Sequence, residues 1–437
     1  MALKLYDTMT RAKRDFVPVV PGKVGMYVCG MTVQDKPHIG HMCSSIAGDV
    51  IRRYLEHLGF KVTYVYNFTD VDDKIIERAN SEKLDYTSVA ERNIEAYMWA
   101  ARAVHVKPAS VYPRATQHIA EIQSIIQRLI DKGSAYAAGG DVYFDVSTKP
   151  DYGKLSGQKV DEMRSGARIE VGEAKRSPLD FALWKGSKPG EPGWPSPWGE
   201  GRPGWHIECS AMSMKYLGET FDIHGGGQDL VFPHHENEVA QSEAATGKPF
   251  VRHWTQNGLV NLGGRKMSKS EKLFFLAEAD VALQRLEFAL EQSGAWDAAG
   301  DPPPPASARF AAETAAAEKN FFEAMDDDIN TPRALAELFN LARTVNRLLE
   351  GAPSSDDRAE ALTTGRMLQR LGGILGLFWS RPQKSGDWPE EVVQLAKERI
   401  EVRKSKNWKR SDEIRDRLKD LGVAVEDTPD GYRLKKL

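Results

Sequence analysis

The chain has 437 residues, of which 41% are hydrophobic and 28% charged, and its formal net charge is −3. Because one hydrophobic core stops growing at roughly 250–300 residues, this length predicts two or three domains. The small net charge argues against indiscriminate binding of nucleic acid, and with no bilayer-spanning apolar run and no signal-type N-terminus we expect a cytoplasmic protein without a membrane partner. Its three cysteines are too few for a disulfide framework, which favours metal ligands or buried thiols.

The first elements predict an α/β fold. Residues 24–28 have the pattern of a buried strand, residues 39–58 that of a helix and residues 61–66 that of a second strand. A strand, a helix and a strand in this order predict two parallel strands joined by a right-handed crossover. Ligands bind beyond the carboxyl ends of such strands, so we expect a site in the loop between residues 28 and 39.

Residues 115–200 interrupt this pattern with a helix, a strand-like run at 141–146 and a stretch rich in Gly, Pro and Trp. We interpret them as an inserted subdomain between two halves of one α/β domain, 1–114 and 201–292. The four consecutive prolines at 302–305 make residues 293–307 a stiff spacer, because proline cannot continue a helix.

Helical patterns follow the spacer. Pro332 stands at a predicted helix start and apolar residues then repeat at helical spacing, which predicts an amphipathic helix in a bundle at 308–385. Residues 392–421, within a small module at 386–437, are again helical. Between Lys397 and Lys419 they hold ten Lys or Arg against five Asp or Glu, with Trp408 among them. Such a pattern is typical of an RNA-binding surface, although a solvated charged face with one packed Trp explains it equally well.

Two histidines, His38 and His41, flank Ile-Gly at the predicted start of the first helix. A helix start presents free N–H groups and partial positive charge, and Gly40 leaves room for close approach of a phosphate. We therefore predict that these imidazoles bind ATP and stabilise charge at its α-phosphate. A lone His-x-x-His is more often a pair of surface histidines, so this prediction depends on a second motif.

The second motif is a Lys/Ser loop far downstream that contains Lys266, Ser268 and Lys269. Its cations and small donors could follow the triphosphate as pyrophosphate leaves, whereas such a loop alone is usually just solvated. The two motifs in this order predict an adenylate-forming enzyme. Its catalytic residues would be His38, His41, Lys266 and Lys269, and Gly40 and Ser268 would also bind ATP.

These motifs resemble the cysteinyl-tRNA synthetase family over nearly the whole chain. The resemblance also rests on the runs at 26–30, 67–74, 204–210, 222–229 and, beyond the spacer, 326–332. It implies a class I Rossmann-type catalytic domain with an inserted subdomain, followed by an α-helical bundle and a small anticodon-binding module. It also implies ATP with Mg²⁺, L-cysteine and tRNA(Cys) as substrates.

His234 and Glu238 are four residues apart, so on a helix opened by Pro233 both would project from one face and could hold one ion, with His235 pointing elsewhere. Cys29 from the first loop and Cys209 from a distant strand end would complete the site. Two soft thiolates favour one Zn²⁺ per chain over Mg²⁺. Because zinc binds a thiolate far better than a serine hydroxyl, such a site would select cysteine without an editing domain.

The resemblance implies further roles around the substrates. Thr69 and Asp229 would lie near the substrate ammonium, Trp205 would wall the pocket, and Gly30 and Thr32 would also bind the amino acid. The simpler alternatives are a strand-end cap for Thr69, a loop-stabilising carboxylate for Asp229 and a core contact for Trp205. In the C-terminal module, Trp408 and Asp412 would contact tRNA.

The chain departs from the family's usual residues around the ATP site, at Gln34, at Met42 and Cys43, and at Gln256. After Ser270 it leads almost directly into a helical run at 277–292, where the family usually has a longer joining segment. That segment normally supports the second-motif loop and contacts tRNA. Its shortening is therefore expected to affect the transfer of cysteine to tRNA more than the activation of cysteine.

We predict a monomer that forms cysteinyl-adenylate and transfers cysteine to the 3′ end of tRNA(Cys). A cysteine ligase of the mycothiol-pathway type would pass the same adenylate to a small amine, but it would have little use for the residues after Asp301. A third possibility is an impaired paralogue that only binds RNA or cysteine. The complete motifs argue against an impaired paralogue, whereas the shortened joining segment after Ser270 is consistent with one.

Overall fold

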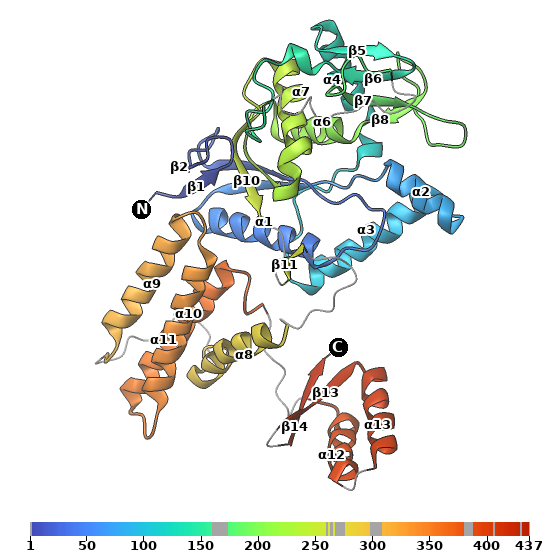
Figure 1. Ribbon diagram of the computed structural model, residues 1–437. Helices are drawn as coiled ribbons and strands as arrows, with labels where there is room; N and C mark the ends of the chain where they lie inside the picture. Colours follow the sequence, from blue (N-terminus) through green and yellow to red (C-terminus); the bar gives the residue numbers. More distant parts are fainter. Residues whose placement is uncertain are drawn as a thin grey trace. The chain divides into compact units, whose positions relative to one another are not determined.

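The computed structural model describes residues 2–159, 174–258, 261–262, 265–266, 276–297, 308–379, 388–404, 407–428 and 431–436. The chain divides into two compact units, Met1–Leu377 and Phe378–Leu437 (Figure 1). Within the ranges just given, none of the helices has the length and apolar character needed to cross a membrane.

A four-stranded parallel sheet lies at the centre of the first unit, in the order β10-β9-β3-β4. Its strands are β3 (Lys23–Val28), β4 (Lys61–Tyr66), β9 (Phe221–Gly227) and β10 (Val251–Asn257). Helix α1 (Ile39–His57) connects β3 to β4, as the sequence predicted. The chain adds β4 on one side of β3 and β9 on the other, so the strand order reverses at β3, which is where such sheets bind ligands.

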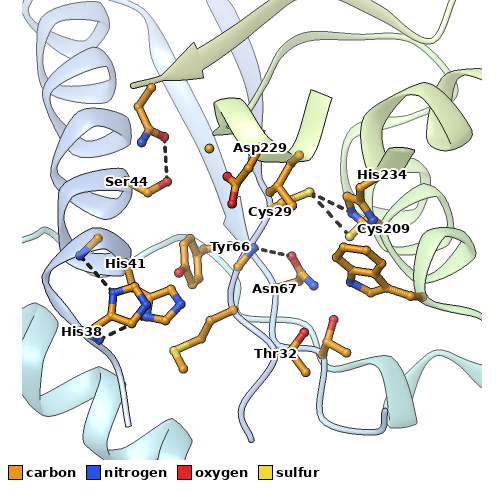
Figure 2. Close-up of a pocket in the computed structure, with 18 of the residues that line it drawn as sticks. Cys29, Thr32, His38, His41, Ser44, Tyr66, Asn67, Cys209, Asp229 and His234 are labelled. Atoms are coloured by element: carbon orange, nitrogen blue, oxygen red, sulfur yellow. Dashed lines mark hydrogen bonds between the residues drawn. The ribbon is translucent and has the colours of Figure 1, made fainter. Parts of the chain in front are cut away.

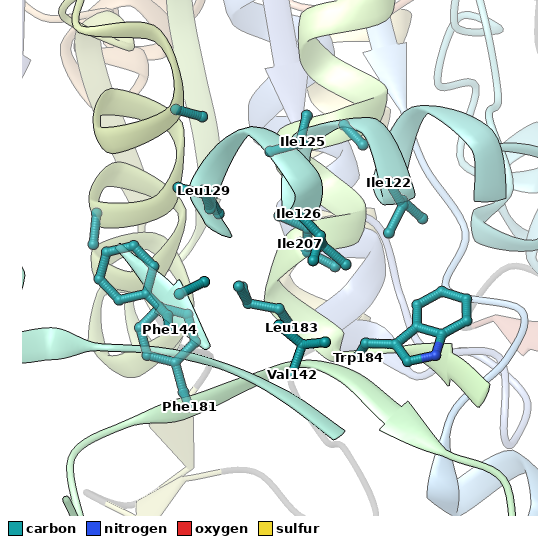
Figure 3. Close-up of a cluster of buried hydrophobic side chains, with 14 of the residues drawn as sticks. Ile122, Ile125, Ile126, Leu129, Val142, Phe144, Phe181, Leu183, Trp184 and Ile207 are labelled. Atoms are coloured by element: carbon teal, nitrogen blue, oxygen red, sulfur yellow. The ribbon is translucent and has the colours of Figure 1, made fainter. Parts of the chain in front are cut away.

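The segment predicted as an insert, together with the three residues after it, builds an antiparallel sheet, β5-β6-β7-β8, beside helix α4 (Ile119–Asp131). The strands are β5 (Ala135–Ala138), β6 (Asp141–Phe144), β7 (Phe181–Gly186) and β8 (Gly201–Pro203). Apolar residues of α4 at helical spacing, among them Ile122, Ile126 and Leu129, pack on this sheet and on Ile207 of helix α6 (Trp205–Leu217) (Figure 3). Helix α7 (Glu236–Thr246) joins the same core. The inserted sheet therefore supports two helices that lead to the central site.

Further elements complete the part of the first unit around the central sheet. Strands β1 (Lys4–Asp7) and β2 (Ala12–Asp15) form a hairpin, and α2 (Asp73–Glu82) and α3 (Tyr86–Ala103) follow β4. The 3₁₀ turns are Ala115–Gln117, Val146–Thr148 and Gln228–Leu230, and the last of these leads into the π-helical turn Val231–His235. A short hairpin of β11 (Asn261–Leu262) and β12 (Arg265–Lys266) follows β10.

Four helices form the bundle of the first unit: α8 (Leu276–Ser293), α9 (Ala311–Asp326), α10 (Thr331–Leu349) and α11 (Ser355–Ile374). Helix α10 begins as predicted, with Pro332 in its first turn and the Asn330 side chain accepting from the Arg333 N–H. The bundle is tied to α1, because Tyr54 Oη donates to Asp326 at 2.7 Å.

The second unit pairs helices α12 (Glu390–Lys404) and α13 (Trp408–Asp420) with the hairpin β13 (Val423–Thr428) and β14 (Gly431–Lys436). The single helical run predicted at 392–421 is therefore wrong in one respect, because it is two helices. The Asn407 side chain accepts from the Arg410 N–H at 3.2 Å and caps the start of α13. The two helices then bury Val392 and Ala396 against Ile414 and Leu418.

Candidate active site

A cavity of about 350 Å³ opens beyond the carboxyl ends of the central strands (Figure 2). Most of the predicted site residues line it, namely Cys29, Gly30, Thr32, His38, Gly40, His41, Thr69, Trp205, Cys209, Asp229 and His234. His38 and His41 lie on one side, Cys209 and His234 on the other, and Asp229 between them (Figure 2). The backbone of Lys266 belongs to β12, whereas Ser268 and Lys269 lie outside the described residues. Trp408 and Asp412 belong to the second unit.

The start of α1 holds the histidine pair in a fixed arrangement. His38 is the N-cap, and its Nδ1 accepts from the Gly40 N–H at 3.1 Å. His41 Nδ1 accepts from the His38 N–H at 3.2 Å, so the two imidazoles form a reciprocal capping box. Their rings stack with centroids 3.8 Å apart. A Cβ at Gly40 would lie 3.0 Å from the His38 ring, so a side chain there would disturb this pair.

The loops after β3 and β4 lie backbone against backbone. Gly30 N donates to Asn67 Oδ1 at 2.8 Å, and a Cβ at Gly30 would lie 1.6 Å from the Asn67 carbonyl oxygen, so only glycine fits. Thr69 N donates to the Met31 carbonyl at 3.3 Å, and Val33 N donates to the Thr69 carbonyl at 3.2 Å. These bonds place Thr32 beside Thr69 on the cavity wall.

Four buried side chains meet at the far side of the cavity. Cys29 Sγ lies 3.7 Å from Cys209 Sγ and 3.5 Å from both His234 Nε2 and Glu238 Oε1. His234 Nε2 lies 3.1 Å from Glu238 Oε1, as expected for residues four apart on one helical face. One ligand atom from each residue fits within 4.8 Å of the others, so the group could hold a metal ion. The structure thus brings the four predicted ligands together.

Three details of this prediction are wrong. Cys209 lies in the second turn of α6 and not at a strand end, because a helix begins directly after Gly204. Pro233 does not open a regular helix, since it lies in the π-helical turn before α7. That turn also brings His235 to the cluster, where ligand atoms of Cys29, His224, His235 and Glu238 lie within 4.8 Å of one another.

Two further histidines contact two of the four ligands, Glu238 and His234. His224 Nε2 lies 2.9 Å from Glu238 Oε2, and the His224 ring stacks on Trp254 with centroids 4.5 Å apart. On the other side, His206 Nδ1 lies 3.0 Å from His234 Nδ1. Such contacts fix the orientation of metal-ligating imidazoles and carboxylates. Neither His206 nor His224 was predicted as a site residue, although both fall in the runs that carried the family resemblance.

The buried ionisable groups of the four-residue cluster shift one another's pKa values. Burial raises the pKa of the Cys29 thiol, which donates its hydrogen bond to Cys209. Burial also acts to raise the pKa of Cys209, but the bond from Cys29 and the nearby His234 lower it to about 6. For His234, burial acts to lower the pKa, but Glu238 and Cys209 raise it to about 10. Without an ion, the protonated His234 therefore partly offsets the negative charge of Cys209 and Glu238, and a bound cation would take over that role.

The remaining cavity wall combines an aromatic ring with polar side chains. Trp205, the first residue of α6, places its ring centroid 4.4 Å from that of His234. Thr69 Oγ1 donates to Glu208 Oε2 at 2.8 Å, a bond that opposes the rise in the Glu208 pKa caused by burial. Ser44 Oγ donates to Asn257 Oδ1 at 2.9 Å and joins α1 to the end of β10. Further wall residues were not predicted as site residues, namely Ser44, Tyr66, Asn67, Lys74 and Asn257.

Two of the residues that depart from the family's usual pattern also lie at the site. Gln34 lines the cavity. Gln256 Nε2 lies 3.4 Å from His235 Nδ1, and its Oε1 contacts the Thr8 hydroxyl. Gln256 therefore contacts His235, a member of the second group of possible metal ligands.

The chain matches three families in succession. Residues 15–290 match the tRNA synthetases class I (C) catalytic domain, residues 320–379 the DALR domain, and residues 385–433 the cysteinyl-tRNA ligase anticodon binding domain. A protein named cysteine–tRNA ligase from Geobacter metallireducens is 49% identical, with 100% of both chains covered. The chain belongs to the cysteinyl-tRNA ligase family. A relative of the same name from Heliobacterium modesticaldum is 46% identical, again with 100% of both chains covered.

The alignment with the Geobacter ligase spans 483 positions against 437 residues here, so that relative contains positions that this member of the family lacks. The fold is also similar to that of a solved structure. Mycobacterium tuberculosis methionyl-tRNA synthetase in complex with methionyl-adenylate superposes with a TM-score of 0.56 at 14% identity, covering 85% of this chain and 96% of that one. The predicted class I fold is therefore confirmed.

Proposed function

We propose that the chain activates L-cysteine with ATP and Mg²⁺, releases pyrophosphate, and transfers cysteine from cysteinyl-adenylate to the 3′-terminal ribose of tRNA(Cys). One observation carries this proposal. A stacked histidine pair at a helix start and a buried group of two thiols, an imidazole and a carboxylate lie on opposite sides of one cavity (Figure 2). Phosphates and a sulfur-bearing side chain could thus be held at the same time.

The donor set supports zinc as the ion, with one Zn²⁺ per chain. Cys29 and Cys209 supply two soft ligands, which exclude Mg²⁺, and His234 and Glu238 complete a four-ligand set from one ligand atom each. When bound, zinc would supply a soft Lewis acid that favours a thiolate over a hydroxyl group. The contacts of Glu238 with His224 and of His234 with His206 would keep these ligands oriented.

ATP is assigned to the opposite side. His38, Gly40 and His41 form the first turn of α1, where N–H groups and the helix dipole favour phosphate. Because their Nδ1 atoms accept backbone N–H bonds, both imidazoles are oriented before ATP binds. Lys266, Ser268 and Lys269 would follow the departing pyrophosphate, with Mg²⁺ accompanying the triphosphate.

The amino acid is assigned to the space between these two groups. Asp229 offers a carboxylate for the substrate ammonium, Trp205 a wall, and Thr69 a hydroxyl group. Gly30 and Thr32 would contact the amino acid from the loop after β3. This placement puts the substrate carboxylate on the side of the histidine pair, where the adenylate forms.

The tRNA is assigned to the C-terminal region, with a bundle at 308–385 and an anticodon module at 386–437. Trp408 is 55% exposed at the first position of α13, and the Arg403 guanidinium lies 5.4 Å from its ring centroid. The Asp412 side chain is 61% exposed on the same helix. An exposed ring beside a guanidinium group suits a stacked base. We further propose a monomer that works in the cytoplasm, where tRNA charging takes place.

Two assays test this function. Exchange of labelled pyrophosphate into ATP should depend on cysteine, and tRNA with a GCA anticodon should accept cysteine. His38→Ala and His41→Ala should abolish exchange, whereas His105→Asn, at a left-handed backbone position outside the cavity, should retain it. Exchange without charging would favour a small-amine acceptor. Absence of cysteine-dependent exchange in the wild-type protein would contradict the whole proposal.

A further inference from the structure

Three charged residues join the inserted sheet to the start of helix α2. Lys185 of β7 and Arg202 of β8 are directly opposite each other in the antiparallel pair, so their side chains lie on the same face. Lys185 Nζ donates to Oδ2 of Asp73 at 2.9 Å, and Arg202 Nη2 donates to Oδ1 of the same carboxylate. Asp73 is the first residue of α2. We call Asp73, Lys185 and Arg202 the Asp73 group.

The charges of the Asp73 group are well defined. Burial acts to raise the pKa of the Asp73 carboxyl, but Lys185 and Arg202 hold that pKa below its usual value, and an arginine is always protonated in proteins. The Arg202 side chain is only 7% exposed, and it also lies 3.5 Å from Glu191. A buried cation that loses a partner must move or find water. The Asp73 carboxylate therefore fixes the position of β8 relative to α2.

The Asp73 group connects the segments that form two walls of the cavity. Asp73 comes four residues after Thr69, and Trp205 comes three residues after Arg202. Thr69 and Trp205 both line the cavity. Trp205 begins α6, which also carries Cys209 in its second turn. The group therefore joins the loop that carries Thr69 to the helix that carries one of the candidate sulfur-side ligands.

A metal ion alone does not determine which thiol amino acid fits the cavity. Zinc would distinguish a thiolate from a hydroxyl group, but homocysteine, which is one methylene group longer than cysteine, offers the same thiolate. The length of the side chain must therefore be read from the distance between the metal ligands and the residues assigned to the ammonium, Thr69 and Asp229. A pocket of fixed size typically discriminates one methylene group by about 10–200-fold.

We propose that the Asp73 group is a set of positioning residues that holds the amino-acid pocket at the length of cysteine and so disfavours longer thiol amino acids such as homocysteine. This inference rests on the proposed function, because it requires an amino acid held between the metal ligands and Thr69. The group acts through the spacing of the two walls, since none of its three residues lines the cavity. The inserted sheet would thus contribute to the choice of substrate.

The test compares cysteine, homocysteine and serine as substrates in pyrophosphate exchange. In the wild-type protein kcat/KM for cysteine should exceed that for homocysteine about tenfold or more. Asp73→Ala and Arg202→Met should each lower this ratio about fivefold or more, because the two walls can then separate. The preference for cysteine over serine should change less than about twofold, because it depends on the metal ligands, which neither variant alters.

Further variants separate positioning from a general defect. The double variant Asp73→Ala/Arg202→Met should lower the ratio no further than either single variant, because the two residues act as one pair. Lys215→Met is the matched control, since it removes an ion pair with Glu121 in the last turn of α6, and it should alter neither preference. If Arg202→Met does not fold, Lys185→Met removes a more exposed partner of Asp73 and takes its place in the comparison. Bound zinc is measured in every variant.

Three outcomes would overturn the inference. The first is a wild-type protein that uses homocysteine as well as cysteine, and the second is an unchanged ratio in Asp73→Ala. The third is an equal loss of both preferences, which indicates a general loosening of the site. Cysteine-dependent exchange in the wild-type protein together with an unchanged ratio in the variants contradicts only the role of the Asp73 group, whereas absence of exchange contradicts the proposed function.

Discussion

The Sγ atoms of Cys29 and Cys209 lie 3.7 Å apart, although 180 residues separate the two cysteines in the sequence. The first follows β3 and the second lies in α6, which packs against the inserted subdomain. Both thiols are buried beside Glu238 and His234, so their positions are fixed by the packing of the whole first unit. An arrangement of this kind is costly to bury without an ion to hold, which leads to the first prediction.

Cys209→Ser should lower bound zinc and weaken cysteine activation while leaving the fold intact, because a hydroxyl group is a poorer zinc ligand than a thiolate. The measurements are metal content, circular dichroism, and pyrophosphate exchange with cysteine and with serine. Cys43→Ser is the matched control, since Cys43 is half-buried in α1 outside the cluster. Unchanged preference for cysteine over serine in Cys209→Ser would contradict selection by the metal.

Removal of the metal should have the same effect reversibly. Dialysis of the wild-type protein against a zinc chelator should abolish cysteine-dependent exchange, and added Zn²⁺ should restore it, whereas Mg²⁺ alone should not. Full activity in protein shown to be free of transition metal would rule out the proposed role of the cluster.

The loop at residues 149–156 holds the start of α7, and this predicts an effect on stability. The buried Glu236 carboxylate accepts from Gly153 N at 3.0 Å and from Ser156 N at 2.7 Å. Glu236→Ala would remove the acceptor of the buried Gly153 N–H and of the half-buried Ser156 N–H, which lowers the free energy of unfolding by about 1–3 kcal/mol. Urea unfolding measures the difference. Glu95→Ala, at an exposed position of α3, should change stability by less than about 0.5 kcal/mol.

Local patterns explain what could be predicted of the fold. The strands β3 and β4 and the helix between them follow from short runs of apolar residues, and the first turn of α10 from Pro332. The break between α12 and α13 was missed because the sequence there has no Gly or Pro, and a single Asn407 cap separates the helices. A single capping residue in the sequence does not reveal that two helices packed on each other bury more apolar surface than one continuous helix would.

In the site, too, local spacing could be predicted from the sequence and long-range contacts could not. His234 and Glu238 are neighbours on a helical face, so their spacing alone suggested a joint ligand role. Cys29 and Cys209 were added to this pair because of their residue type, and the contact of His224 with Glu238 was not foreseen. The hydrogen bond between Thr69 and Glu208 could not be predicted from the sequence, because the two residues are 139 positions apart and only folding brings them together.

Lys269→Ala should lower kcat of pyrophosphate exchange more than it raises KM for ATP. The lysine is expected to interact with the triphosphate most strongly as pyrophosphate leaves, so its loss affects the transition state more than the ground state. Steady-state exchange kinetics over a range of ATP concentrations separate the two effects. Lys248→Ala, which removes a surface ion pair with Glu219, is the control. A large rise in KM with unchanged kcat would contradict this role.

Trp408→Ala should impair charging of tRNA(Cys) and leave pyrophosphate exchange unchanged, because Trp408 belongs to the second compact unit and the cavity to the first. Loss of a base stacked on the ring would weaken tRNA binding by about 1–3 kcal/mol, which appears as a higher KM for tRNA. Trp408→Phe keeps an aromatic face and should retain most of the charging activity. If Trp408→Ala charges tRNA as well as the wild-type protein does, the exposed ring has no role in RNA binding. In that case the basic residues around it form only a solvated surface.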